Sequence, residues 1–186
     1  VTRGLMQWPA LAVVAVAALG IAYVPVFYAK PKPIPFPRQA SAFRAPAALD
    51  QALAEWSAVV QQDPENINAW TELALAHFEK GPDDYLPALE ALERARDLGA
   101  LDERLFYYAG VMYEAKGLLD YAAADDERFL RRHPEDAEVR LRLANIFYRL
   151  DDNEKAVLHY QRVVAERPDD PVPAMNLAIV YRDQSK

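Results

Sequence analysis

The fold is decided by the stretch from Ala137 to Pro168, which reads Ala-Glu-Val-Arg-Leu-Arg-Leu-Ala-Asn-Ile-Phe-Tyr-Arg-Leu-Asp-Asp-Asn-Glu-Lys-Ala-Val-Leu-His-Tyr-Gln-Arg-Val-Val-Ala-Glu-Arg-Pro. Its apolar residues recur at spacings of three and four, which is typical of amphipathic helices, and they do not alternate as in a strand. Pro168 closes the second helix, and Pro134, which closes the helix before this stretch, lies 34 residues earlier. The stretch therefore predicts a pair of helices that forms one unit of a repeat.

The same pattern recurs along most of the chain. Small residues at one position of each unit would let two antiparallel helices approach closely, and an alanine in the second helix would fill the facing slot. Gly81 and Gly117 are expected at the turn within a pair. The repeated positions are Ala74, Gly110, Ala144 and Ala178 (small), His77, Tyr113, Phe147 and Tyr181 (aromatic or His), and Ala88, Ala122 and Ala156 (alanine of the second helix).

This pattern resembles the tetratricopeptide repeat over about residues 52–181. The resemblance implies an all-α fold, with about eight helices after the N-terminal segment, wound into a right-handed superhelix. We expect a leading half-repeat at 48–63, three repeats at 64–100, 101–134 and 135–168, and a capping helix at 169–186. Because such repeats bury a core only by stacking, the half-repeats should be needed for stability.

Four features depart from the pattern of the family, and the first is Pro82-Asp83, which extends the turn of the first unit by two residues. Ala100 stands where the closing proline of the first unit is expected, and Asp126 stands at a slot that is normally aromatic. Arg140 occupies the position that Trp70 and Phe106 hold in the other units. These departures are ordinary for single repeats and leave the interpretation unchanged.

The N-terminal segment is predicted to cross a membrane. No charge lies between Arg3 and Lys30, and the 20 residues from Pro9 to Tyr28 would span about 30 Å as a helix, the thickness of a bilayer core. Trp8 and the aromatic residues near Tyr28 fit interfacial belts. A cleaved signal peptide would need a shorter apolar region and a small-residue cleavage site. We therefore expect a tail at 1–8 and a transmembrane helix at 9–28 in contact with lipid.

Residues 29–47 are rich in proline, which favours an extended, semi-rigid spacer over a docking motif for a proline-recognising domain. Basic residues follow the predicted span, and the positive-inside rule alone would place the following domain in the cytoplasm. The short N-terminal tail instead fits a signal anchor with that domain outside. We expect a single-pass protein of a bacterial inner membrane, with the repeats on the periplasmic side and the cytoplasmic side left open.

Charge and motifs exclude several classes of function. Residues 1–46 hold five basic and no acidic residues, so the remainder carries 16 basic and 28 acidic groups and should repel nucleic acid. The chain has no Cys and no phosphate-binding or catalytic motif. His77, His133 and His159 are scattered and are expected to be structural. We predict no enzyme, no metal, no cofactor and no small-molecule substrate.

Acidic pairs occur at 83–84, 125–126, 151–152 and 169–170. We expect them mostly at turns and helix starts, where their carboxylates would cap backbone amides, rather than as a catalytic dyad or a calcium site.

The resemblance also implies a concave groove, lined by the first helix of each pair, that holds an extended or helical peptide. Apolar and aromatic groups mixed with Arg and Asn suit a peptide with hydrophobic anchors. The lysine and asparagine of the carboxylate-binding groove known in the family are absent, since Thr71 and Leu75 stand there. The predicted lining is Asn68, Thr71, Leu75, Phe78, Arg104, Tyr107, Tyr108, Val111, Leu141, Arg142, Asn145, Tyr148, Arg149, Met175, Asn176 and Ile179.

Two functions remain open from the sequence. The first is a scaffold or accessory subunit that docks its groove onto protein subunits of a larger membrane complex. The second is an assembly factor similar in layout to the anchored repeat proteins of bacterial cytochrome c maturation. A third reading, an accessory domain for an enzyme that acts on peptidoglycan or polysaccharide, rests only on the periplasmic location.

Overall fold

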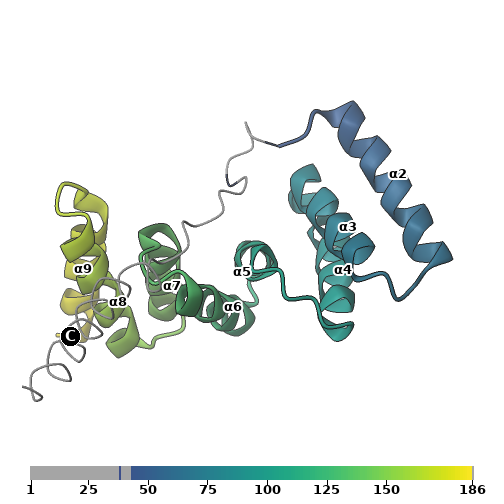
Figure 1. The fold of residues 1–186 in the computed structure, drawn as a ribbon. Helices are drawn as coiled ribbons and strands as arrows, with labels where there is room; N and C mark the ends of the chain where they lie inside the picture. The colour runs from purple at the N-terminus through teal and green to yellow at the C-terminus, as the bar shows by residue number, and fades with distance from the viewer. Residues whose placement is uncertain (1–37, 39–42, 186) are drawn as a thin grey trace, which may run out of the picture. The chain divides into compact units, whose positions relative to one another are not determined.

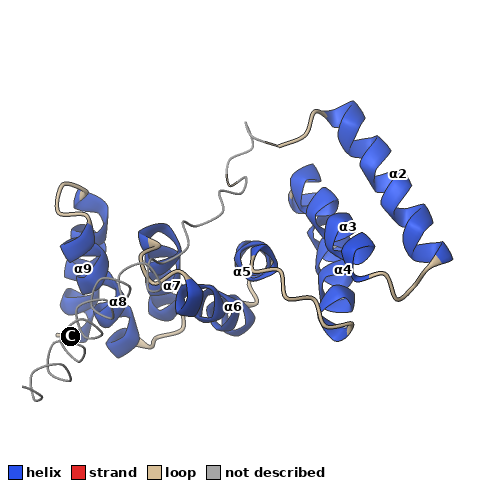
Figure 2. Ribbon diagram, in the orientation of Figure 1, coloured by secondary structure: helices blue, strands red, loops and turns tan. Residues whose placement is uncertain are grey.

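A computed structural model describes Arg38 and residues 43–185, and these residues form helices joined by short turns (Figure 1). No strand occurs within them (Figure 2), which confirms the predicted all-α repeat. The helices are α2 (Pro46–Gln62), α3 (Ile67–Lys80), η2 (Pro82–Asp84, a 3₁₀ turn), α4 (Tyr85–Asp97), α5 (Arg104–Ala115), α6 (Leu119–Arg132), α7 (Ala137–Arg149), α8 (Asn153–Glu166) and α9 (Pro171–Gln184).

Consecutive helices pair as hairpins. The closest pairs are α3 with α4, α5 with α6 and α7 with α8, while α2 packs on α3 and α9 packs on α8. The predicted transmembrane helix, from Pro9 to Tyr28, lies outside the described residues. In the part of the chain that is described, no helix combines the length and the apolar character needed to cross a membrane.

The turns within the hairpins use the residues that the repeat pattern singled out. Gly81 and Gly117 adopt positive φ angles of 115° and 75°, which glycine accepts without steric cost. In the third hairpin the equivalent turn has Asp151 at φ 59°, a conformation that aspartate tolerates better than most residues. The Pro82–Asp84 turn accommodates the longer connection of the first hairpin.

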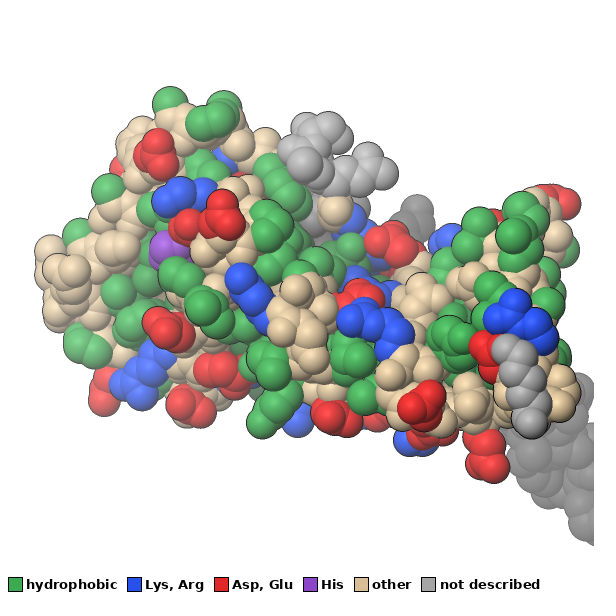
Figure 3. All heavy atoms as spheres, turned by 180° about the vertical axis from the view of Figure 1, so that it is seen from behind, with side chains coloured by type: hydrophobic (Ala, Val, Ile, Leu, Met, Phe, Trp, Pro, Cys, Tyr) green, Lys and Arg blue, Asp and Glu red, His purple; other side chains and the backbone are tan. Residues whose placement is uncertain are grey.

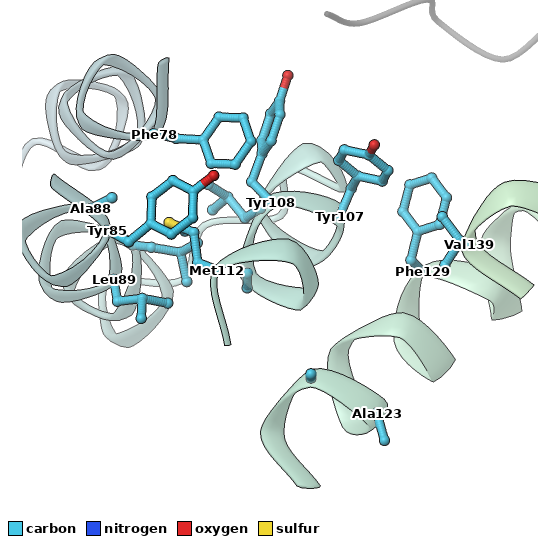
Figure 4. Close-up of a cluster of buried hydrophobic side chains, with 14 of the residues drawn as sticks. Phe78, Tyr85, Ala88, Leu89, Tyr107, Tyr108, Met112, Ala123, Phe129 and Val139 are labelled. Atoms are coloured by element: carbon cyan, nitrogen blue, oxygen red, sulfur yellow. The ribbon is translucent and has the colours of Figure 1, made fainter. Parts of the chain in front are cut away.

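The repeated small residues lie where helices meet. Ala88, Ala122 and Ala156 are completely buried in the second helices, and Ala74, Gly110 and Ala144 are buried opposite them. One continuous cluster of buried side chains extends from Val60 to Val180. Its middle part is drawn in Figure 4, where the aromatic rings of Tyr107 and Phe129 face one another across α5 and α6. The core therefore runs without interruption through the successive hairpins.

Arg140 makes the same kind of hydrogen bond as Trp70, which holds the equivalent position in the first unit. The indole N–H of Trp70 donates to the carbonyl of Pro64, six residues earlier, and a guanidinium N–H of Arg140 donates to the carbonyl of Pro134, also six residues earlier. Arg140 is buried, as a core position requires. A side-chain N–H that ties the start of the first helix to the preceding turn is thus common to both units.

The prediction that acidic pairs cap helices holds for only part of the set. Asp152 and Asp170 accept hydrogen bonds from backbone amides at the starts of α8 and α9. Asp136, which is not in the predicted set, does the same at the start of α7. For Asp125 and Asp126 the prediction was wrong, because both lie in the interior of α6 and are buried.

Asp125 and Asp126 link one hairpin to its two neighbours. Successive helical residues point about 100° apart, so the two carboxylates face different helices. Asp125 accepts two hydrogen bonds from Arg96 of α4, at 3.0 and 3.1 Å. Asp126 pairs with Arg142 of α7, whose Nε lies 2.9 Å from Oδ2. Adjacent acids in α6 therefore bind the preceding and the following hairpin.

Gly110 is a glycine because Asp126 occupies the space that a side chain would need. A Cβ at position 110 would fall well inside the van der Waals distance of Asp126 Oδ1 and lie 3.0 Å from Arg142 Nη2. Gly110→Ala gains about 1 kcal/mol of helix propensity and loses about 1–3 kcal/mol to overpacking. We expect a net destabilisation, measured by urea unfolding. In an Asp126→Ala background the same substitution should become stabilising, and a loss in both backgrounds would contradict this packing.

The half-buried His159 should make the free energy of unfolding fall in acid. It stacks on Phe147, with ring centroids 5.5 Å apart, and burial, followed by the charges of Arg140, Arg162 and Lys155, lowers its pKa to about 4. The unfolded chain, with a His pKa of about 6.5, binds the extra proton first, so stability falls as pH drops from 6.5 towards 4.

Allowing for the partial exposure of the ring, the loss should be about 1–2 kcal/mol. Urea unfolding at pH 7 and pH 4.5 measures it, and the His159→Gln variant should lack this component. An equal pH dependence in both proteins would contradict the assignment.

Candidate functional site

The 16 residues predicted to line a groove fall into three groups in the structure. Because the first helices α3, α5, α7 and α9 carry all of them, we call the surface of these helices the first-helix face. Asn68, Arg149 and Met175 are exposed. Half-buried residues are Arg104, Val111, Leu141, Arg142, Asn145, Tyr148, Asn176 and Ile179. Buried residues are Thr71, Leu75, Phe78, Tyr107 and Tyr108, which pack between helices.

Polar residues of the first-helix face bind one another from repeat to repeat. Arg104 of α5 reaches Glu72 of α3 at 3.3 Å, and Arg149 of α7 reaches Glu114 of α5 at 3.0 Å. Tyr148 of α7 donates to Asp183 of α9 at 2.8 Å. The partners lie 32–35 residues apart, close to one repeat length. These contacts hold equivalent helices in register.

Five of the predicted residues line a hollow of about 180 Å³ between α7, α8 and α9. The amide oxygen of Asn145 accepts hydrogen bonds from Tyr160 (2.6 Å) and from Asn176 (3.2 Å). Within the described residues, the amide nitrogen of Asn145 donates no hydrogen bond. The hollow has room for one side chain and offers a donor to a backbone carbonyl. Its lining is Asn145, Tyr148, Arg149, Tyr160, Asn176 and Ile179.

A second site, between α5, α6 and α7, is occupied by Arg38 of the proline-rich segment. Nη2 of Arg38 lies 2.6 Å from Asp136 Oδ2, and Nη1 lies 3.4 Å from Glu138 Oε2. The guanidinium carbon is 4.6 Å from the ring centroid of Tyr107 and 5.7 Å from that of Phe129. We call Tyr107, Phe129, Asp136 and Glu138 the arginine pocket.

The described end of the same segment also packs on the repeats. The ring of Phe43 packs edge-on against that of Phe78, with centroids 5.7 Å apart. The guanidinium of Arg44 donates two hydrogen bonds to the Glu79 carboxylate at the end of α3. At Arg38, Phe43 and Arg44 the segment therefore contacts its own domain, whereas the sequence favoured a free spacer. The spacer role of the other residues of 29–47 stays a prediction.

Sequence reasoning missed three members of the arginine pocket. Asp136 is not among the residues predicted to cap a helix or to line the groove, and in the structure it caps α7 by accepting from Val139 N–H. Phe129 and Glu138 carry no sequence signal beyond a helical pattern. Tyr107 was predicted, and its hydroxyl donates to Glu138 at 3.1 Å. Only the fold shows that these residues converge.

Two of the three histidines lie beside acidic side chains. His77 lies 2.9 Å from Asp84, and His133 lies 3.1 Å from Glu103. A wider hollow, of about 640 Å³, lies between α4, α5 and α6, but its charged lining includes Arg96, Asp125 and Arg128, which pair with one another. Within residues 43–185, no three His, Asp or Glu side chains gather as a metal site requires.

Comparison with known proteins identifies the type of repeat. Residues 122–171 match the sequence profile of the tetratricopeptide repeat. The fold is that of a tetratricopeptide repeat protein. The tetratricopeptide match covers most of α6, all of α7 and α8, and the first residue of α9, so it includes part of the arginine pocket and of the hollow.

Solved structures of other proteins resemble the chain over most of its length. The crystal structure of YrrB, described as a TPR protein with an unusual peptide-binding site, aligns with a TM-score of 0.68 at 19% identity, over 75% of this chain and 71% of that chain. A crystal structure of MamA aligns with a TM-score of 0.64 at 17% identity, over 81% and 87%. At these identities the likeness shows the fold alone.

A curated relative is the BBSome complex member BBS4 of Xenopus tropicalis, which is 26% identical over 137 residues. The match covers 73% of this chain and 26% of the relative. The chain thus spans about a quarter of the length of this relative.

Proposed function

We propose that the chain is a non-enzymatic scaffold that binds a protein partner through its first-helix face and is anchored to a membrane by residues 9–28. The partner is a subunit of a larger membrane complex, onto which this domain docks as an accessory subunit. The lipid anchor rests on the sequence from Pro9 to Tyr28, and the protein-binding role rests on the tetratricopeptide fold.

The observation that carries the protein-binding role is the hollow between α7, α8 and α9. Its volume of about 180 Å³ suits one side chain of a polypeptide, since sites for small molecules typically measure 300–1,000 Å³. Asn145 offers an amide donor next to the apolar surfaces of Tyr148 and Ile179. A backbone carbonyl and a neighbouring side chain of an extended peptide would satisfy both features.

Charges of both signs are mixed on the surface. Figure 3 shows acidic and basic side chains interspersed with apolar ones over the face that it presents. The acidic excess of the repeats disfavours nucleic acid as a partner.

Site-specific photocrosslinking in intact membranes tests this proposal. A photoreactive phenylalanine analogue in place of Tyr148, in the hollow, should yield a discrete adduct with one polypeptide of the washed membrane fraction. The matched control is the same analogue in place of Tyr121, an exposed tyrosine of the second helix α6. Equal adducts from both positions, or none from position 148, would reject the proposal.

A further inference from the structure

We propose that the arginine pocket is a recognition site for an extended peptide of a partner protein that presents an arginine, and that Arg38 of this chain occupies the pocket as an internal competitor. The inference rests on the proposed function, because it names the chemistry of the partner that the first-helix face would bind. It commits to a basic peptide, whereas the hollow at α7–α9 specifies no charge.

The carboxylates of the pocket match the shape of a guanidinium. Asp136 and Glu138 bind different nitrogens of Arg38, at 2.6 and 3.4 Å, so the planar fork is gripped at two points. The Asp136 side chain is only 12% exposed. A lysine, with a single ammonium, could not reach both carboxylates in this way.

Aromatic rings form the rest of the pocket and favour arginine further. Tyr107 and Phe129 are buried, and both rings lie within 6 Å of the guanidinium carbon. The bond from the Tyr107 hydroxyl to Glu138 fixes the ring and one carboxylate together. In Figure 4 the two rings lie side by side, and the Tyr107 ring points out from α5.

The largely buried carboxylate of Asp136 needs a cation beside it. Although burial opposes it, the hydrogen bonds from Arg38 and from Val139 N–H lower the pKa of Asp136, so the carboxylate stays charged at neutral pH. If Arg38 left, the charge of Asp136 would lose its cationic partner beside buried aromatic rings, whereas Glu138, with a 55% exposed side chain, would be solvated. Another guanidinium is the group that restores both the charge and the stacking.

Arg38 is placed so that the arginine of a partner peptide can displace it, and it is not a fixed part of the hydrophobic core. It belongs to the segment before α2 and retains 26% exposure, and the carboxylates that it binds lie about 100 residues away in the sequence. Because it is covalently tethered, its effective concentration at the pocket is on the order of millimolar. A partner peptide must therefore displace it, and removing Arg38 should strengthen binding in trans.

The test uses the full chain in detergent and a synthetic peptide with the sequence of residues 33–43, Pro-Ile-Pro-Phe-Pro-Arg-Gln-Ala-Ser-Ala-Phe, labelled for fluorescence anisotropy. Arg38→Gln should lower the Kd of the peptide at least tenfold relative to the wild type. Arg44→Gln is the matched control, because Arg44 belongs to the same segment but binds Glu79 instead, and it should leave the Kd unchanged.

Two further arms separate specific recognition from general charge attraction. Adding Asp136→Asn to Arg38→Gln should weaken binding at least tenfold, and since asparagine also caps helices well, the fold should be preserved. A peptide with lysine at the central arginine should bind Arg38→Gln at least tenfold more weakly than the arginine peptide. Urea unfolding of each variant confirms that it is folded.

Equal Kd values for the wild type and Arg38→Gln, or for the arginine and lysine peptides, would overturn the inference. Such a result leaves the proposed function intact if position 148 still crosslinks to a partner. The reverse result, peptide binding without a crosslink, would reject the membrane-complex scaffold and keep the arginine pocket.

Discussion

Asp126→Ala will lower the free energy of unfolding by about 3–5 kcal/mol, the cost of leaving one member of a buried ion pair without its partner. Asp126 is completely buried, and the Arg142 side chain that it binds is only 13% exposed. Burial raises the pKa of Asp126 to about 6, against the opposing bond from Arg142, so the carboxylate is ionised at pH 7. Truncation would leave the guanidinium charged beside the ring of Tyr107.

Urea unfolding at pH 7 measures this loss. The matched control is Glu127→Ala, because Glu127 is an exposed acid of the same helix. Its free energy of unfolding should change by no more than about 0.5 kcal/mol. Replacing both partners, as Asp126→Leu with Arg142→Met, should recover much of the stability, because apolar groups of similar size need no partner. A loss below about 1 kcal/mol for Asp126→Ala would show that the pair does not hold α6 and α7 together.

Leu143→Ala is the second large effect, with an expected loss of about 2–5 kcal/mol from a cavity in the core. Leu143 of α7 is completely buried in the continuous cluster, whereas Leu158 of α8 is 63% exposed. Leu158→Ala removes the same atoms and should change stability by less than about 0.5 kcal/mol. Thermal melts should separate the two variants by roughly 5–15 °C. Equal melting temperatures would contradict the packing of the third hairpin.

The repeat was predictable because its signals are local and periodic. Gly81 and Gly117 were assigned to turns from their spacing, and their positive φ angles follow from the same requirement. Ala88, Ala122 and Ala156 recur at one-repeat intervals because a larger side chain would separate paired helices, and each is completely buried. A geometric requirement that every repeat shares therefore selects the same type of residue at the same position of each repeat.

Contacts that occur in only one repeat could not be predicted in this way, because they leave no periodic signal in the sequence. Asp125 and Asp126 looked like turn residues because adjacent acids usually face solvent, and the arginines that bind them across helices, Arg96 and Arg142, lie 29 and 16 residues away in the sequence. The arginine pocket depends on Arg38, which lies in a segment with no helical period, and on Asp136, which lies at the predicted boundary between two repeats and carries no binding signal of its own. For Thr71 and Leu75, a small shift in register separates a groove position from a buried one.

Paramagnetic broadening tests the central claim, that the first-helix face binds an extended polypeptide, most directly. The full-length Arg38→Gln chain, labelled with ¹⁵N, is mixed with the 33–43 peptide bearing a nitroxide label at its N-terminus. We expect the amide signals of α5 and α7 to be broadened, among them those of Tyr107 and Glu138, while those of α4 and α8 keep their intensity. Broadening centred on the second helices, or none at saturating peptide, would contradict it.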